Sequence, residues 1–306
     1  MIREKLFSDI RQVLRASIDF ASIVLHPLCR LLEKNRVRIL CYHRVCNLPE
    51  TDDVMRYLNV PPAMFALQMV FLSQNGFNVI TLEQFIEHRD KNMKFPPKSI
   101  IITFDDGYRD NYLNAFTILE KHNFKGTFFV ATDYISSNRV FNWLRLGDES
   151  LAHSRENEEY WLPLRREEIR EMGNQGACFG SHTKSHCHLN EVEQGKAMEE
   201  LTGSKEYLEE VLAKPVSCFC YPFGEFSRPI KASVKIAGYK AAVSTKWGSN
   251  TLKSNPTELR RITIEEKDSL DRFVRKVDGA YDWWFRWLVP LMVSVQQLIY
   301  QRQRRK

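Results

Sequence analysis

One stretch decides the fold: residues 99–107, with the sequence Ser-Ile-Ile-Ile-Thr-Phe-Asp-Asp-Gly. Residues 99–104 form a near-continuous apolar and β-branched run, which is typical of a strand buried on both faces of a parallel sheet. Asp105 and Asp106 follow where this strand is expected to end, and Gly107 allows the backbone to turn sharply after them. Because the carboxyl ends of strands carry the catalytic groups of α/β barrels, the two acids are candidates for chemistry. An Asp-Gly turn with solvated carboxylates would have the same sequence.

Short apolar runs alternate with amphipathic segments on both sides of this stretch. This alternation indicates an α/β fold, and the number of strands favours a distorted (β/α) barrel of about seven to eight strands with extra terminal helices. The expected strands are Arg38–Tyr42, Asn78–Thr81, Ser99–Phe104, Gly126–Val130, Ala177–Gly180, Val216–Tyr221, Ala241–Ser244 and Leu259–Ile264. The expected helices are Pro61–Gln74, Tyr112–His122, Leu164–Met172, Glu191–Leu212 and Pro229–Ala237. Residues 133–162 lack clear periodicity and are expected to form a long loop over one end of the sheet.

A second polar cluster, residues 180–186, follows another apolar run. His182 and His186 lie four residues apart and would share one face if the segment made a helical turn. Such a pair can bind one metal ion, although two surface histidines in a polar loop have the same spacing. One Asp and two His make a three-ligand set with open positions for water and substrate, as in catalytic metal sites. A second carboxylate beside them suits general-base catalysis on that water.

These motifs resemble those of the polysaccharide deacetylase family, also called carbohydrate esterase family 4 or the NodB-homology family. Residues 103–107 match its first motif, residues 181–186 match its H-[ST]-x-x-H second motif, and residues 220–224 (Cys-Tyr-Pro-Phe-Gly) look like its third. The resemblance runs from about Arg38 to Ile264. It implies a metal-dependent hydrolase that removes an N-acetyl group from an amino sugar in a polysaccharide, an oligosaccharide or a lipid-linked glycan precursor. The implied cofactor is a divalent metal, with zinc first among the candidates.

The resemblance also implies roles for individual residues. Asp105 is expected to be the catalytic base, and Asp106, His182 and His186 are the expected metal ligands. Tyr221 is expected to give a backbone N–H to the oxyanion hole. The residues expected to bind substrate are Tyr108, Trp143, Tyr221, Pro222 and Phe223.

Two further catalytic candidates lie at the ends of the matched region. Residues 42–45 (Tyr-His-Arg-Val) resemble the YHxV opening of the branch that includes poly-N-acetylglucosamine deacetylases. The family implies that His43 could protonate the leaving amine, although a strand-end histidine packed under a loop would have the same sequence. Arg261, on the last expected strand, is the candidate partner of Asp105, with its neighbour Arg260 as the alternative.

The sequence departs from the family pattern in three places. The third motif lacks the Arg that many members place before the Pro, and Ser217 and Cys218 stand near that position. Residues 244–248 contain no Asp-x-x-Asp fourth motif, and the Leu-x-x-His fifth motif is missing. His43 is one candidate for the role of the missing histidine.

The basic residues gather at the two ends of the chain. Residues 1–45 carry nine Lys and Arg against four Asp and Glu, a balance of +5, and residues 283–306 carry five against none, also +5. Since the net charge is +6, residues 46–282 carry −4. An acidic body with basic ends argues against nucleic acid as a partner. The seven cysteines include no C-x-x-C pair and are expected to be reduced core residues.

Three segments are expected: an amphipathic N-terminal helical segment (1–37), the catalytic domain (38–268), and a C-terminal helical, Trp-rich basic segment (269–306). The apolar stretches of both end segments fall short of the ~20 apolar residues that a spanning helix needs, and no signal-peptide pattern is present. Two basic ends, of which the C-terminal one bears Trp, favour a cytoplasmic enzyme that rests peripherally on the inner face of the cell membrane. A C-terminal helix docked on the barrel is the open alternative.

Two other functions stay open at this point. A catalytically silent carbohydrate-binding protein would keep the barrel, but it should have lost a ligand or the base, and all are present here. A non-haem iron oxygenase shares the set of two His and one carboxylate. It does not explain Asp105, and strand–helix alternation suits it poorly. Metal analysis with an acetate-release assay would separate the three.

Overall fold

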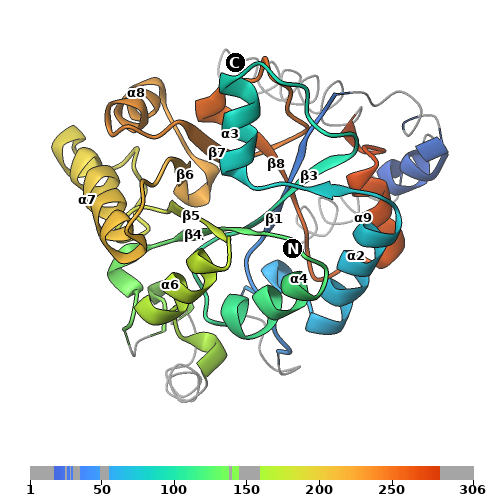
Figure 1. The fold of residues 1–306 in the computed structure, drawn as a ribbon, viewed down its shortest axis with the longest axis horizontal. Helices are drawn as coiled ribbons and strands as arrows, with labels where there is room; N and C mark the ends of the chain where they lie inside the picture. Colours follow the sequence, from blue (N-terminus) through green and yellow to red (C-terminus); the bar gives the residue numbers. More distant parts are fainter. Residues whose placement is uncertain are drawn as a thin grey trace, which may run out of the picture.

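The computed structural model describes residues 17–24, 26, 27, 29, 35–48, 55–137, 140–144 and 159–282. Eight parallel strands form one sheet (Figure 1). They are β1 (Arg38–Tyr42), β2 (Asn78–Val79), β3 (Ser99–Phe104), β4 (Thr127–Val130), β5 (Cys178–Ser181), β6 (Cys218–Cys220), β7 (Ala241–Trp247) and β8 (Leu259–Thr263). Because β1 pairs with both β8 and β3, seven strands close into a barrel and β2 lies outside β3. The predicted distorted barrel is confirmed.

Helices surround the barrel (Figure 1). The α-helices are α2 (Pro62–Gln74), α3 (Leu82–Asp90), α4 (Thr117–Lys121), α6 (Arg166–Asn174), α7 (Gln194–Leu212), α8 (Arg228–Ile236) and α9 (Leu270–Val277). Shorter turns are η1 (Arg56–Leu58), the π-helical η2 (Asn111–Phe116), η3 (Thr132–Tyr134), η4 (Asn142–Leu144), η5 (Glu159–Trp161), η6 (Pro222–Gly224) and η7 (Pro256–Glu258). The expected helices are present, and α3 is an addition. Its capping box, in which Thr81 and Gln84 bond reciprocally, is a Thr-x-x-Gln signal that the sequence does contain.

The pairing of β1 with β3 positions the first catalytic candidates. All six residues of β3 are buried, as the apolar run predicts. Tyr42 on β1 lies opposite Phe104 on β3, so His43 and Asp105 follow side by side at the carboxyl ends of neighbouring strands. Phe104 stacks on Phe128 of β4 with ring centroids 4.8 Å apart, which anchors this end of β3 in the core.

The terminal segments are described in part. Residues 17–24 are helical and lie beside α9, whose Phe273 is buried in the core. Of the predicted C-terminal segment (269–306), residues 269–282 are described and include α9, whereas residues 283–306 lie outside the described residues. So does most of the predicted 133–162 loop between η4 and η5. None of the described helices has the length and apolar character needed to cross a membrane. No disulfide joins cysteines in the described part of the chain.

Candidate active site

The backbone turns sharply where β3 ends. Asp106 and Gly107 adopt left-handed conformations, with φ of 74° and 86°. A Cβ atom on Gly107 would lie 2.7 Å from Cγ1 of Val130 on β4, so only glycine fits this close approach. The turn directs the carboxylates of Asp105 and Asp106 to different partners, and both side chains are almost fully buried.

The carboxylate of Asp106 meets two imidazoles beyond the end of β5. Nε2 of His182 and Nε2 of His186 each lie 3.4 Å from Oδ1 of Asp106, and the three ligand atoms lie within 4.8 Å of one another. Nδ1–H of His182 donates to the carbonyl oxygen of Cys220 (2.8 Å), which leaves its Nε2 facing Asp106. Burial and the charge of His182 lower the pKa of His186 to about 4, so this imidazole is neutral near pH 7. The donor set therefore fits a divalent metal.

The loop that carries the two histidines is not helical. The segment does not make a helical turn, because residues 182–187 form no helix and Thr183 and His186 both have positive φ. The N–H of His186 donates to Oγ1 of Thr183 (2.9 Å). Two more backbone N–H groups, of residues 184–185, donate to Oε2 of the buried Glu200 on α7 (2.9 Å each). Loop hydrogen bonds, and not a helix face, bring the two imidazoles together.

Arg261 on β8 holds the second carboxylate, that of Asp105. Nη1 donates to Oδ1 at 2.6 Å and Nη2 to Oδ2 at 2.7 Å, a bidentate pair. Burial would raise the pKa of Asp105, but the guanidinium lowers it well below its usual range. Arg260, the alternative partner, is exposed and donates instead to the carbonyl oxygen of Trp247. Asp105 is therefore ionised and fixed in one orientation.

Two thiols and an imidazole complete the surroundings of Asp105. Sγ of Cys41 lies 3.6 Å from Oδ2, and Sγ of Cys220 lies 3.5 Å from the same oxygen. Nε2 of His43 lies 3.9 Å from Oδ2, beyond hydrogen-bond range. Its Nδ1 is buried and has no hydrogen-bond partner among the described residues. His43 is thus at the predicted place. Neither thiol is among the expected site residues, although each lies in or beside a matched motif.

Among the described residues, two other clusters of potential metal ligands both include Asp105. The guanidinium of Arg261 already bonds both oxygens of this carboxylate, and it would repel a second cation. The cluster of Asp106, His182 and His186 has no arginine or lysine paired with its carboxylate within the described part of the chain. It is the cluster that fits the metal.

The structure does not place the backbone N–H of Tyr221 in an oxyanion hole. This N–H donates to the carbonyl oxygen of Val243 (3.2 Å), which continues the pairing of β6 with β7. The side chain is fully buried and its hydroxyl donates to the carbonyl oxygen of Thr257 (2.9 Å). Both hydrogen-bond donors of Tyr221 are used by the fold, so this geometry supports neither the expected oxyanion role nor the expected contact with substrate.

Aromatic side chains flank the triad. The rings of Trp143 and Phe223 lie 4.4 and 4.7 Å from the imidazole of His186. Phe223 is 48% exposed and Trp143 is partly exposed, so both can meet a ligand, as expected. Tyr108 and Pro222 are buried instead. Tyr108 accepts a hydrogen bond from Nε1 of Trp143 (2.7 Å), so it positions that ring and does not itself line an open surface.

His188 is an addition to the expected site. Its ring stacks on Phe223 with centroids 3.8 Å apart and planes 3° from parallel, and its Nδ1–H donates to Oε2 of Glu225 (3.1 Å). Phe223 has φ of 58°, a strained conformation for a bulky residue. The stack supports this strained turn. No spacing rule connects His188 with Phe223, because they come from different loops.

The comparisons with known proteins agree with this geometry. A family model described as polysaccharide deacetylase matches residues 92–242, which include Asp105 and all three candidate ligands. Over these residues, the chain is similar to the polysaccharide deacetylase family. Members of this family depend on a metal ion, and the triad is where this chain can hold one.

Two relatives cover most of the chain. A polysaccharide deacetylase of Bacillus subtilis is 25% identical over 246 residues, which are 80% of this chain and 76% of the relative. A poly-β-1,6-N-acetyl-D-glucosamine N-deacetylase of Staphylococcus aureus is 25% identical over 269 residues, 82% of this chain and 86% of the relative.

Solved structures share the barrel. A polysaccharide deacetylase from Bacillus cereus is 27% identical with a TM-score of 0.65, over 79% of this chain and 69% of that one. A deacetylase from Streptococcus pyogenes, bound to acetate, has a TM-score of 0.67 at 23% identity, over 79% of this chain and 98% of that one. The second likeness establishes the fold.

Proposed function

We propose that this protein is a metal-dependent hydrolase that removes an N-acetyl group from an amino sugar and releases acetate. One observation carries the proposal: three ligand atoms of Asp106, His182 and His186 converge beside the ionised, fixed carboxylate of Asp105. A metal site with a carboxylate next to it supplies the parts that hydrolysis of an amide needs.

Zinc is the proposed metal. One carboxylate and two imidazoles are a three-ligand set typical of catalytic zinc, which keeps a further position open. The bound ion would polarise the acyl oxygen and lower the pKa of the attacking water.

The chain's own residues move the protons. Asp105 takes the proton of the attacking water, and Arg261 holds the acceptor carboxylate in place. The low pKa of Asp105 makes it a weak base, so it gives up the acquired proton readily. His43 lies 3.9 Å from Oδ2 of Asp105 and is placed to protonate the leaving amine.

The proposed substrate is a chain of N-acetylated amino sugars, as a polysaccharide, an oligosaccharide or a lipid-linked glycan. The partly exposed rings of Trp143 and Phe223 offer apolar faces beside the triad, on which the apolar face of a sugar ring can stack. The name of the Staphylococcus aureus relative supports a polymer of N-acetylglucosamine.

The proposed location is the inner face of the cell membrane, where the enzyme is peripherally bound. The two basic ends, each with a balance of +5, support attraction to anionic lipid. Removal of residues 283–306 is expected to shift the protein from the membrane fraction to the supernatant of a cell lysate. Unchanged fractionation would contradict the C-terminal part of this proposal.

An Asp105→Asn variant tests the chemistry. Acetate release from N-acetylglucosamine oligomers should fall by about a hundredfold or more, the usual scale for loss of a general base, while zinc content stays at the parent level. Asp271→Asn, at an exposed acid on α9, is the matched control and should keep full activity. If Asp105→Asn keeps activity, the role of the base is wrong. If the zinc-loaded parent binds oligomers without releasing acetate, the protein is a silent carbohydrate-binding member instead.

A further inference from the structure

An unusual apolar surface lies on the helix formed by residues 17–24. Phe20, Ile23 and Val24 are 69%, 54% and 61% exposed. Their spacing of three and four residues puts them on one side of the helix. Single exposed apolar residues are ordinary, but three that share one helix face form a contact surface.

One edge of this helix is fixed to the barrel. Asp19 accepts a hydrogen bond from the hydroxyl of Tyr281 (2.7 Å), and Nε2 of His26 bonds Oδ2 of Asp278 (2.7 Å). By helical periodicity, Asp19 and His26 lie about 100° and about 120° around the helix from Phe20, along one edge of the apolar face. Polar contacts along this edge fix the orientation of the helix, and the three apolar side chains are exposed in that orientation.

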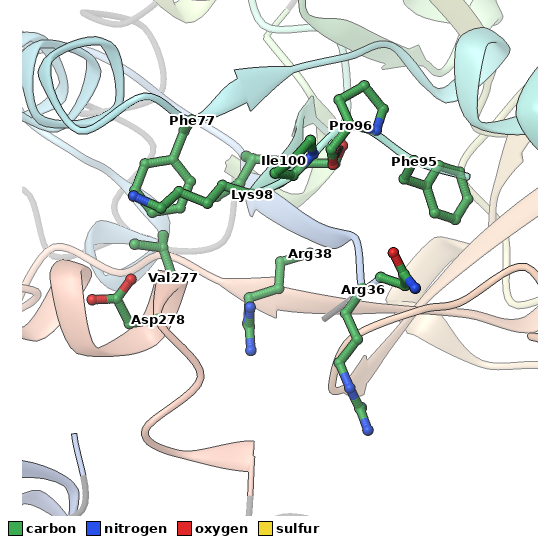
Figure 2. Close-up of a pocket in the computed structure, with 12 residues that line it drawn as sticks. Arg36, Arg38, Phe77, Phe95, Pro96, Lys98, Ile100, Val277 and Asp278 are labelled. Atoms are coloured by element: carbon green, nitrogen blue, oxygen red, sulfur yellow. Dashed lines mark hydrogen bonds between the residues drawn. The ribbon is translucent and has the colours of Figure 1, made fainter. Parts of the chain in front are cut away.

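A cationic cavity lies next to the contact between His26 and Asp278. It has a volume of about 310 Å³ and lies at the amino ends of β1 and β3, and Asp278 is one of its lining residues. Arg36, Arg38 and Lys98 also line it, and Figure 2 shows the guanidinium groups of Arg36 and Arg38 pointing toward the same side. Since His26 bonds Asp278, the helix and the cavity meet at this carboxylate.

The balance of charge in the cavity is positive. Arg38 forms an ion pair with Asp282 (3.1 Å), and Asp278, the single acid among the described lining residues, is bonded to the helix. Arg36 donates to a serine hydroxyl, and Lys98 donates to a backbone carbonyl. Within the described part of the chain, no acidic side chain pairs with Arg36 or Lys98. Two cations are thus left to attract an anion.

We propose that the apolar helix face and the cavity form one docking surface for an anionic lipid bilayer. This anchoring surface consists of Phe20, Ile23, Val24, Arg36 and Lys98. Apolar side chains enter the boundary between headgroups and acyl chains while adjacent cations bind anionic headgroups. Nucleic acid would use the cations but leave the apolar face in water.

The anchoring surface leaves the catalytic centre accessible. The cavity lies at the amino ends of the strands, whereas Asp105 and the triad follow their carboxyl ends. The inference rests on the proposed membrane location and not on the proposed chemistry. A substrate chain can therefore reach the active site from the side of the barrel that the bilayer does not cover.

Vesicle co-sedimentation of the full chain tests the surface. The parent should bind vesicles of phosphatidylcholine with 30% phosphatidylglycerol, bind pure phosphatidylcholine weakly, and lose affinity as salt is raised. Arg36→Glu with Lys98→Glu should weaken binding by about tenfold or more. A triple change of Phe20, Ile23 and Val24 to Gln, a good helix former, should weaken binding to a similar extent.

Matched controls lie on α8, across the barrel from this helix in Figure 1. Arg228→Glu with Lys235→Glu makes the same change in charge, and Ile236→Gln removes an apolar side chain that is 73% exposed. Neither should alter vesicle binding. All variants should release acetate from soluble oligomers at the parent rate, so loss of binding is distinguishable from failure of the proposed chemistry.

Several outcomes would overturn the docking surface. One is parent-level binding by both variant sets, and another is equal weakening by the α8 controls. A third is complete loss of binding on removal of residues 283–306 while both variant sets bind normally, which would make that segment the sole anchor. The remaining alternative is that the helix face contacts a second copy of this chain. Sedimentation analysis tests it, because the parent would then be a dimer and the triple Gln variant a monomer.

Discussion

The ion pair of Asp105 with Arg261 is the buried interaction on which the proposed base depends. Arg261→Met leaves the carboxylate of Asp105 buried without its partner. The free energy of unfolding should therefore fall by about 3–5 kcal/mol, measured by denaturant unfolding at pH 7. Adding Asp105→Asn to Arg261→Met removes the uncompensated charge and should restore much of that loss. Equal stability of the single and double variants would contradict this account.

The sign of the pH dependence follows from the lowered pKa of Asp105. A carboxyl whose pKa is depressed in the folded state contributes stability above its unfolded pKa, near 3.9, and that contribution is lost as pH falls through the folded pKa. The difference in stability between the parent and Arg261→Met should therefore be largest at neutral pH and shrink in acid. A difference that grows as the pH falls would contradict the assignment.

His188 gives a second prediction for a single residue. His188→Ala removes the ring that supports Phe223 in its strained conformation. If Phe223 stacks on the sugar, KM for oligomers should rise by about threefold to tenfold, the scale of one aromatic pair, with kcat and zinc content little changed. His188→Phe, which keeps a stacking ring, should retain a KM near that of the parent.

A double-variant cycle distinguishes this role from general loss of structure. In a Phe223→Ala background, His188→Ala should have little further effect on KM, because its partner is already gone. Additive effects of the two changes would show that His188 acts independently of Phe223.

At the level of elements, the turn after β3 makes its own prediction. Gly107 and Gly76 both have positive φ, 86° and 67°, but a Cβ would touch Val130 at 2.7 Å in the first case and meet nothing within 4 Å in the second. Gly76→Ala should therefore lose about 1 kcal/mol of stability from backbone strain alone. Gly107→Ala should lose about 1–3 kcal/mol more from overpacking, and it should also displace the carboxylates and reduce activity. Thermal unfolding and acetate release measure the two effects, and equal losses would contradict the proposed close approach.

Elements also show what the sequence could predict. The apolar run of β3 and the two acids after it are local features, so the strand and the place of Asp105 could be predicted. The histidine loop could not be predicted in detail, because its shape depends on the side chain of Glu200 on α7. The hydrogen bond from the Tyr221 N–H to Val243 depends on the register of β6 with β7. The stack of His188 on Phe223 depends on how two separate loops pack together. Motifs identify residues that share a function, but long-range packing decides which of their atoms are free.

At the scale of the molecule, closure of the barrel joins distant parts of the sequence. Strand–helix alternation predicts a parallel sheet, but it does not require β1 to pair with β3 as well as β8. That closure brings Asp105 from β3, Arg261 from β8 and the two thiols from β1 and β6 to one point. The three candidate metal ligands likewise come from the ends of β3 and β5, so the proposed site exists only in the folded chain.

A ligand that binds only the folded chain stabilises it, and this gives a prediction for the whole molecule. Zinc at a hundredfold excess over its dissociation constant should add about 2.7 kcal/mol to the free energy of unfolding. Removing metal with a chelator should lower the melting temperature and abolish acetate release, and adding zinc back should restore both. His186→Ala removes one ligand and should lose most of the zinc-dependent rise. His122→Ala, at the end of α4, changes a histidine that the structure places outside the metal cluster and should keep that rise. If His186→Ala responds to zinc as the parent does, the ion binds elsewhere and the triad is not the metal site.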